Sequence, residues 1–310
     1  MQITRRGLLL SAGCLLTTAV VAAWAGDYFG ATLPSLEVAY AGSMSSIMEG
    51  PIKVAAARNL GLDLHGRAQG SNGLAQLITS GSIRPDLFIC ITPGPMYTVL
   101  RAGKCESAQP IAGTEMVIAY SPKSRFAPAL EGAANGQGRW ADILQTPGFR
   151  FGRTDPATDP QGRNIIFTMM LAAKHYGRPE LVQNILGPVV NERQIFTEPT
   201  LQARLQSGEV DAVAAYKFQP GPFFLPYIAL PKEVNLSDPR TAERYPDVTL
   251  DLDGVAYRPE PLAFYAAVLR GARNSEAAGR FAQWLLSEAA QALFRRNDYG
   301  PAPSTSVLRV

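Results

Sequence analysis

Histidine is scarce in this chain, and the motifs of several enzyme classes are missing. The 310 residues include two histidines, His65 and His175, and neither stands at a spacing typical of a metal site. The sequence has no G-x-S-x-G elbow, no P-loop and no G-x-G-x-x-G fingerprint. It therefore gives no support to a histidine-based zinc enzyme, an α/β-hydrolase or a nucleotide-binding enzyme.

Charge and cysteine are also sparse. Charged residues make up 18% of the chain against 46% hydrophobic residues, and the formal net charge is +3. No basic stripe with interleaved aromatic side chains is present, which excludes a typical nucleic-acid-binding surface. Beyond the N-terminal segment two cysteines remain, Cys90 and Cys105, and an oxidising compartment would permit a disulfide between them. Cys90 closes an apolar run, so a buried free thiol is the alternative.

The N-terminal segment has the anatomy of an export signal. Residues 1–25 begin with a basic stretch containing Arg5 and Arg6, continue with an uncharged apolar run over 7–24, and end in small residues. We therefore predict export to the periplasm or another extracytoplasmic space and expect this segment to take no part in the fold. The adjacent arginines resemble a twin-arginine signal. An uncleaved membrane anchor is the alternative, because the run is at the short end of what spans a bilayer.

Short apolar runs alternate with helical patterns along the remaining residues, which number about 285, enough for two lobes with cores of their own. Strand, glycine-containing turn and helix follow one another repeatedly, which predicts parallel α/β units. No internal repeat or low-complexity linker is present. The predicted strands are 36–40, 62–68, 86–91, 116–120, 149–152 and 210–216, and the predicted helical stretches include 47–57, 74–78, 162–175 and 275–294.

Two Gly-Ser turns stand where predicted strands give way to helices, AGSMSS at 41–46 and QGSNGL at 69–74. Ser43 and Ser71 lie at helix starts, where backbone N–H groups lack partners inside the helix. Such termini bind anions, because free donors and the positive end of the helix dipole face the same point. Simple capping is the alternative. Two such turns at the ends of adjacent parallel strands favour a shared oxyanion pocket.

Carboxylates stand at the heads of two further predicted helices. Asp159 precedes Pro160 at the start of one helix, and Glu198 heads another. A plain capping role would explain each of them. Asp155 stands just after a strand, and we predict that it holds the following turn through side-chain to backbone hydrogen bonds.

Eight segments carry a family resemblance. They are AGSM at 41–44, GSNGLA at 70–75, PDLFI at 85–89, MVIAYS at 116–121, DPATDPQG at 155–162, LQSGEVDAVAAY at 205–216, LPYI at 225–228 and LPKEVNLSDP at 230–239. In this order they resemble the periplasmic molybdate-binding proteins of ABC importers, and more closely their tungstate/molybdate-binding relatives. The resemblance spans nearly the whole chain after the predicted signal.

The resemblance implies a fold and a role. The fold would be α/β, the two-lobed periplasmic-binding-protein fold (type II), with one oxyanion in the cleft between the lobes. Lobe 1 would hold residues 33–119 and 231–310, and lobe 2 residues 120–230. The chain would be a monomer without enzyme activity or cofactor that captures tungstate or molybdate and docks on the membrane permease of an ABC importer.

The same resemblance implies ligand-binding residues. Ser43 and Ser71 would supply hydroxyl and backbone donors from lobe 1. Gln161 and Glu198 stand where the molybdate proteins use main-chain N–H groups, and Tyr216 stands where they place a phenol donor. Gln161 departs from the small residue expected there, which raises a question of crowding.

Asp159 and Glu198 match the two acids that bond to the metal atom in the tungstate/molybdate relatives. Two carboxylates aimed at an intact dianion in a dry cleft would cost several kcal/mol of repulsion. Bonding to the central atom outweighs that repulsion, because hard oxygen ligands suit a high-valent metal. Sulfur in sulfate has no comparable way to expand its coordination, so we expect selectivity against sulfate and phosphate. Asp155 as the ligand in place of Asp159, and the preference between tungstate and molybdate, stay open.

Two other functions stay open as alternatives. The same fold could bind sulfate, phosphate or a small carboxylate. Arg153 and Arg163 could form charge-assisted forks to a carboxylate, although we interpret both as solvated surface charges. Asp159 and Glu198 could also be the general acid/base pair of a cleft hydrolase.

Overall fold

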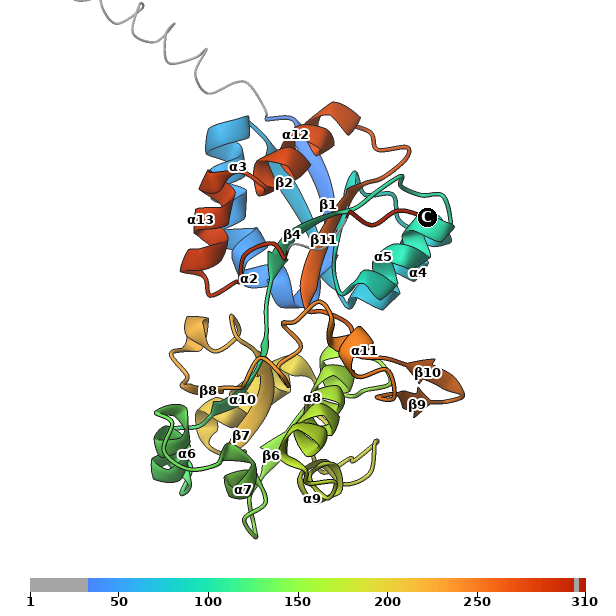
Figure 1. The fold of residues 1–310 in the computed structure, drawn as a ribbon. Coiled ribbons are helices and arrows are strands. Elements are labelled where there is room, and N and C mark those ends of the chain that lie inside the picture. Colours follow the sequence, from blue (N-terminus) through green and yellow to red (C-terminus); the bar gives the residue numbers. More distant parts are fainter. Residues whose placement is uncertain (1–32, 304–306) are drawn as a thin grey trace, which may run out of the picture.

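Two mixed β-sheets organise the chain in the computed structural model, which describes residues 33–303 and 307–310 (Figure 1). The first sheet has the order β2-β1-β3-β11-β4 and the second the order β6-β7-β5-β8. Their strands are β1 (Ser35–Ala41), β2 (Asp63–Gln69), β3 (Leu87–Ile91), β4 (Gln109–Gly113) and β11 (Ala263–Val268), and then β5 (Met116–Tyr120), β6 (Phe151–Gly152), β7 (Ala212–Tyr216) and β8 (Tyr227–Ala229).

The expected parallel units are present in the first sheet, but neither sheet is purely parallel. β1 pairs in parallel with β2 and β3, whereas β11 enters between β3 and β4 in the antiparallel direction. In the second sheet β6 and β7 are parallel, and β5 is antiparallel to both β7 and β8. The chain passes from the first sheet to the second after β4 and returns to the first sheet at β11.

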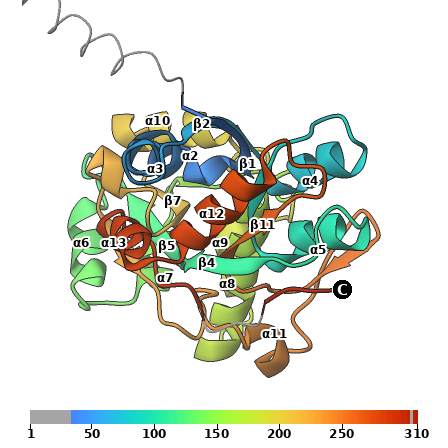
Figure 2. The same cartoon turned by 90° about the horizontal axis from the view of Figure 1, so that it is seen from above.

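Helices cover both faces of each sheet. Figure 2, seen from above, places α3 and α13 on one side of the first sheet and α4 and α5 on the other. In the second sheet Val117 and Val213 face a cluster formed with α10, while Ile118 and Ala214 face the cluster that includes α8. The helices are α2 (Ser45–Ile47), α3 (Lys53–Leu60), α4 (Ser71–Thr79), α5 (Pro93–Arg101), α6 (Ala127–Ala134), α7 (Trp140–Leu144), α8 (Pro160–Tyr176), α9 (Leu181–Leu186), α10 (Glu198–Ser207), α11 (Thr241–Arg244), α12 (Ser275–Leu285) and α13 (Glu288–Arg296), with shorter turns η1 (Gly42–Met44), η2 (Met48–Ile52) and η3 (Gly221–Phe223).

Each sheet with its helices forms one lobe, and Figure 1 shows the two lobes one above the other. We call the half with the first sheet lobe 1 and the half with the second sheet lobe 2. The predicted boundary after residue 119 falls inside β5, which pairs only within the second sheet. A passage of the chain from lobe 1 to lobe 2 at residues 114–115, between β4 and β5, fits the strand pairing better. The division of the chain into these lobes otherwise stays a prediction.

The segment after β8 lies partly against lobe 2. It carries α11 and the hairpin of β9 (Leu250–Leu252) and β10 (Val255–Tyr257). Asp247 forms an ion pair with Lys174 of α8, and the guanidinium of Arg163 lies 4.7 Å from the ring centroid of Tyr257. These contacts attach a part of 231–310, which was predicted for lobe 1, to a lobe 2 helix.

The predicted export signal lies outside the described residues. Within residues 33–303 and 307–310, none of the helices combines the length and the apolar character needed to cross a bilayer.

Cys90 and Cys105 are both buried free thiols. Burial raises the pKa of Cys105 to about 11 and that of Cys90 well above its ordinary value. We expect the folded protein to react very slowly with a disulfide reagent at pH 8, because about one Cys105 side chain in a thousand is then a thiolate. Denaturation without reductant should release both thiols. If neither titrates after denaturation, the two cysteines are joined.

Candidate functional site

The start of α8 is held by two aspartates with different roles. Asp159 is the N-cap, and its Oδ1 accepts a hydrogen bond of 2.9 Å from the backbone N–H of Gln161. Asp155 Oδ1 accepts from the N–H of Ala157 at 2.9 Å, which is the turn-holding role predicted for it. A Cβ on Gly162 would lie 2.4 Å from the carbonyl oxygen of Thr154. Glycine is therefore required for the helix to start this close to the preceding turn.

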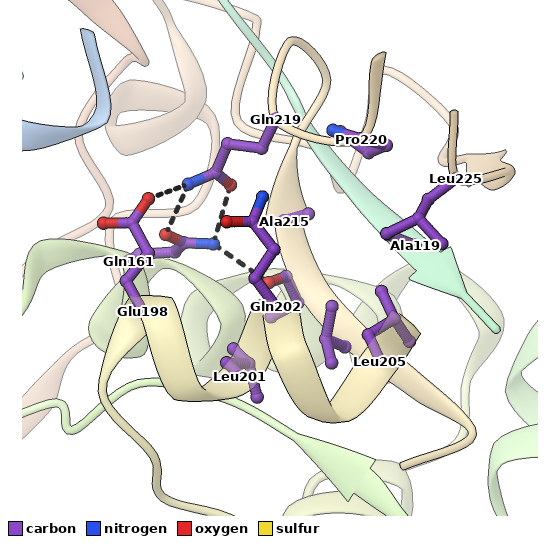
Figure 3. A pocket seen from close by; sticks show the side chains of 12 residues that line it. Ala119, Gln161, Glu198, Leu201, Gln202, Leu205, Ala215, Gln219, Pro220 and Leu225 are labelled. Carbon is purple, nitrogen blue, oxygen red and sulfur yellow. Dashed lines mark hydrogen bonds between the residues drawn. The ribbon is translucent and has the colours of Figure 1, made fainter. Parts of the chain in front are cut away.

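Glu198 is joined to Gln161 through Gln219, a residue that sequence reasoning missed. Gln219 Nε2 donates to Glu198 Oε1 at 2.7 Å and to Gln161 Oε1 at 3.2 Å, and Gln161 Nε2 donates back to Gln219 Oε1 at 3.0 Å. Figure 3 shows these bonds as a continuous chain between the start of α10 and the segment after β7. We call Gln161, Gln219 and Glu198 the amide–carboxylate network.

Tyr216 ends β7 and is almost completely buried, with 2% of its surface exposed. Asn164 of α8 donates from Nδ2 to the Tyr216 hydroxyl at 3.0 Å. The ring stacks on Phe218, with 5.9 Å between the centroids. The phenol is therefore fixed by contacts from its own lobe.

The pKa values of Asp159, Glu198 and Tyr216 are all raised above their ordinary values. Burial raises the pKa of Asp159, against the opposing hydrogen bond from Gln161. Burial and then the negative charge of Asp159 raise the pKa of Glu198, while the Gln219 amide opposes this rise. Burial, followed by the Asp159 charge, also raises the pKa of Tyr216 well above its ordinary value. The charge of Asp159 thus disfavours ionisation of Glu198, and a free anion placed beside the two carboxylates would be repelled.

The two Gly-Ser turns of lobe 1 lie at the carboxyl ends of β1 and β2 in the first sheet. β1 and β2 are in register at Ala41 and Gln69, so Gly42 and Gly70 follow at neighbouring strand ends. Ser71 is 1% exposed, and its Oγ accepts a hydrogen bond from Ile91 N–H at 3.3 Å. This bond gives Ser71 a structural duty in the core of lobe 1.

The structure brings Asp159, Gln161, Glu198 and Tyr216 together but shows no direct contact from Ser43 or Ser71 to them. The neighbours of two of these residues do share a cavity. Asn72, next to Ser71, and Pro160, next to Asp159, both line a cavity of about 340 Å³ that also reaches Asn164. The start of α4 in lobe 1 therefore faces the start of α8 in lobe 2.

A second, smaller cavity of about 40 Å³ lies inside lobe 2 between α10 and the second sheet (Figure 3). Leu201, Leu205 and Leu225 form much of its wall, while the amide–carboxylate network lies at one side. Its apolar wall makes it unsuited to an oxyanion.

Arg153 and Arg163 were interpreted as solvated surface charges, and that interpretation is wrong. Their exposed fractions are 0% and 8%. Arg153 donates to the carbonyl oxygens of Pro188 and Val189 at 3.1 and 2.7 Å, so it holds the loop before α10. Arg163 donates to the carbonyl oxygen of Pro156 at 2.9 Å. Both guanidiniums are engaged by backbone acceptors, which a local sequence reading cannot reveal.

The long side chain of Gln161 is accommodated because its amide is hydrogen-bonded inside lobe 2. Nε2 donates to the carbonyl oxygen of Ala214 at 2.9 Å as well as to Gln219, and the residue is 4% exposed. Its backbone N–H, predicted to reach a ligand, donates to Asp159 in this structure. The amide at position 161 therefore anchors the network to β7.

Comparison with known proteins points to one family. Residues 36–300 match a family described as bacterial extracellular solute-binding protein. A putative ABC transporter molybdenum-binding protein of Haloferax volcanii is 30% identical over 265 residues, covering 85% of this chain and 78% of that protein. A molybdate/tungstate-binding protein of Thermococcus kodakarensis is 27% identical over 289 residues, with 85% and 81% covered.

The likeness to solved structures concerns the fold. The sulfate-binding protein SubI of Mycobacterium tuberculosis superposes with a TM-score of 0.57 at 13% identity, covering 87% of this chain and 88% of that one. The chain thus has the two-sheet α/β fold of type II periplasmic binding proteins. Because proteins with different ligands share this fold, the ligand has to be argued from the site.

Proposed function

Because the chain belongs to the family of bacterial extracellular solute-binding proteins, we propose that it captures tungstate or molybdate between its lobes for an ABC importer. Family membership makes it a binding protein, and the alternative of a cleft hydrolase is set aside on that ground. Two relatives named for molybdenum, molybdate or tungstate binding support this choice of ligand.

The observation that carries the ligand assignment is the pair Asp159 and Glu198. The two carboxylates come from the starts of different helices, and burial, followed by the charge of Asp159, raises the pKa of Glu198. An oxyanion held only through its outer oxygens would add its own negative charge to this pair. A six-valent molybdenum or tungsten atom can instead accept both carboxylate oxygens as ligands, so the repulsion between the acids becomes attraction to the metal.

The hydroxyl groups of Tyr216 and Ser71 each have a hydrogen left to donate. A hydroxyl has one hydrogen to give and two lone pairs to accept with. Tyr216 Oη accepts from Asn164, and Ser71 Oγ accepts from Ile91 N–H, so each O–H is left to donate elsewhere. We assign these two hydrogens, together with that of Ser43, to the oxygens of the bound oxyanion.

In this proposal the two lobes close on the bound oxyanion before transport. The ligand favours the closed form by its differential affinity for the closed and open forms. In this proposal the closed protein docks on the membrane permease of the importer as a monomer.

A ligand panel tests the proposal by thermal unfolding. At a tungstate concentration 100 times Kd, binding stabilises the folded form by about 2.7 kcal/mol. This corresponds to a rise in Tm of about 5–10 °C, at roughly 2–4 °C per kcal/mol. We expect tungstate and molybdate to produce such a shift, and sulfate, phosphate, citrate and Ca²⁺ to produce little.

Two results would contradict the panel's expectation in different ways. An equal shift with sulfate would reject metal coordination and leave a general oxyanion-binding protein. A shift with Ca²⁺ alone would show that the carboxylate pair holds a cation, and would reject the oxyanion assignment.

A further inference from the structure

The side-chain amide of Gln219 has a defined orientation. Its Oε1 accepts from the backbone N–H of Tyr216 at 2.7 Å and from Gln161 Nε2 at 3.0 Å. A backbone N–H can only donate, so the oxygen of the Gln219 amide must face Tyr216. Its Nε2, with two hydrogens, must then face the other way.

Both hydrogens of Gln219 Nε2 are used within the network. One is donated to Glu198 Oε1 at 2.7 Å and the other to Gln161 Oε1 at 3.2 Å. Gln161 is fixed in turn, because its Nε2 donates to the carbonyl oxygen of Ala214. A chain of amides with determined orientations thus connects the backbone of β7 to the carboxylate of Glu198 (Figure 3).

Glu198 depends on this connection for its position. It is the first residue of α10, and the preceding Thr197 forms no side-chain cap with the helix. In the part of the chain that the structure describes, the bond from Gln219 is the hydrogen bond that its carboxylate receives. A glutamate side chain has three rotatable bonds, so without this bond its oxygens would sample several positions.

We infer that Gln219 is a positioning residue that holds Glu198 Oε1, orients Oε2 toward the guest and so sets the preference for oxyanions whose central atom accepts a carboxylate. The inference rests on the proposed function. Gln219 itself does not touch the ligand in this scheme. Its contribution appears as selectivity, because a guest such as sulfate gains nothing from an oriented carboxylate.

The test is Gln219→Met, which keeps the length of the side chain and removes the amide. Loss of a group that orients a metal ligand typically lowers affinity by about 10–100-fold. We expect that loss for tungstate in titration calorimetry, with a smaller change for any weak sulfate binding. Tungsten L-edge absorption should show fewer oxygen neighbours or a wider spread of distances than in the wild type.

Gln202→Met is the matched control. Gln202 is a glutamine of similar burial on the wall of the same cavity, and no hydrogen bond joins it to the network in the described residues (Figure 3). Its replacement should leave tungstate affinity within about twofold. Gln219→Ala serves as a second variant in case the methionine variant fails to fold, because it also removes the donor to Glu198 and places no new charge beside that carboxylate.

A double-mutant cycle separates positioning from a general structural effect. In a Glu198→Ala background, Gln219→Met should cost almost no further tungstate affinity. An equal cost in both backgrounds, or tungstate binding within twofold of wild type in the Gln219 variants that fold, would overturn the inference while leaving the proposed function intact. A wild-type protein without preference for tungstate over sulfate would overturn both.

Discussion

Replacing Asp159 or Glu198 by alanine is expected to weaken tungstate binding by a factor of about 100 or more, because outer-shell groups alone contribute 10–100-fold to metal affinity. In the proposed site each substitution removes one donor oxygen from the metal and leaves the other acid in place. Titration calorimetry of both variants measures the loss directly. Affinity near that of the wild type in both would reject their assignment as ligands.

Conservative variants separate coordination from helix capping. Asp159→Asn keeps an oxygen that can accept from Gln161 N–H, so the cap of α8 and the Tm should be retained. An amide oxygen is a weaker ligand than a carboxylate, so tungstate affinity should still fall strongly. If Asp159→Asn binds like the wild type, the aspartate acts as a cap and the metal is held elsewhere.

Asp155→Ala is the matched control for position. It is also a half-buried aspartate of the same turn, but its carboxylate is engaged with Ala157 N–H. The variant should lose some stability through the turn and keep tungstate affinity within a few-fold. A loss as large as that of Asp159→Ala would instead make Asp155 the ligand.

Much of the fold could be predicted because strand and helix patterns are local. The run 116–120 is β5 to the residue, since all five of its side chains are buried. The stretch 275–294 was predicted to be helical and is two helices, because Ser287 caps α13 by accepting from Ala290 N–H. The antiparallel entry of β11 could not be predicted, because it depends on where a distant part of the chain returns.

The candidate site shows the same division between local and distant information. The capping position of Asp159 follows from an Asp-Pro pair at a helix start, and the structure confirms that position. Gln219 carries no local signal, since its partners Glu198 and Gln161 are 21 and 58 residues away. Arg153 was misjudged for the same reason, because the carbonyls that bury it lie 35 and 36 residues further along.

Asp211→Ala is expected to lower the stability of the protein strongly. Asp211 is 1% exposed and precedes β7. Its carboxylate accepts from Ser124 Oγ at 2.7 Å and from Arg150 through the backbone N–H and the guanidinium at 2.8–3.1 Å. Ser124 follows β5, Arg150 precedes β6 and Asp211 precedes β7, so these hydrogen bonds join the ends of three strands of lobe 2.

The expected loss is about 3 kcal/mol, because hydrogen bonds to a charged group contribute about 1.5–3 kcal/mol each and the exposed Arg150 side chain can regain water. This corresponds to a fall in Tm of about 6–12 °C. Tungstate affinity should change little, because the carboxylate lies at the opposite end of β7 from Tyr216. Thermal unfolding followed by circular dichroism measures the effect, with Asp211→Asn as the conservative partner.

The pH dependence of the stability loss distinguishes the loss of a charge from a packing defect. Burial works against ionisation of Asp211, but the bonds from Arg150 and Ser124 outweigh it and lower the pKa. A carboxyl with a lowered folded-state pKa contributes stability that is complete above its unfolded value of about 3.9 and is lost as the pH falls through the folded value. The difference in Tm between wild type and Asp211→Asn should therefore be constant near neutrality and shrink below about pH 4. A difference that stays constant down to acid pH would show that lost packing, and not the charge of Asp211, is the cause.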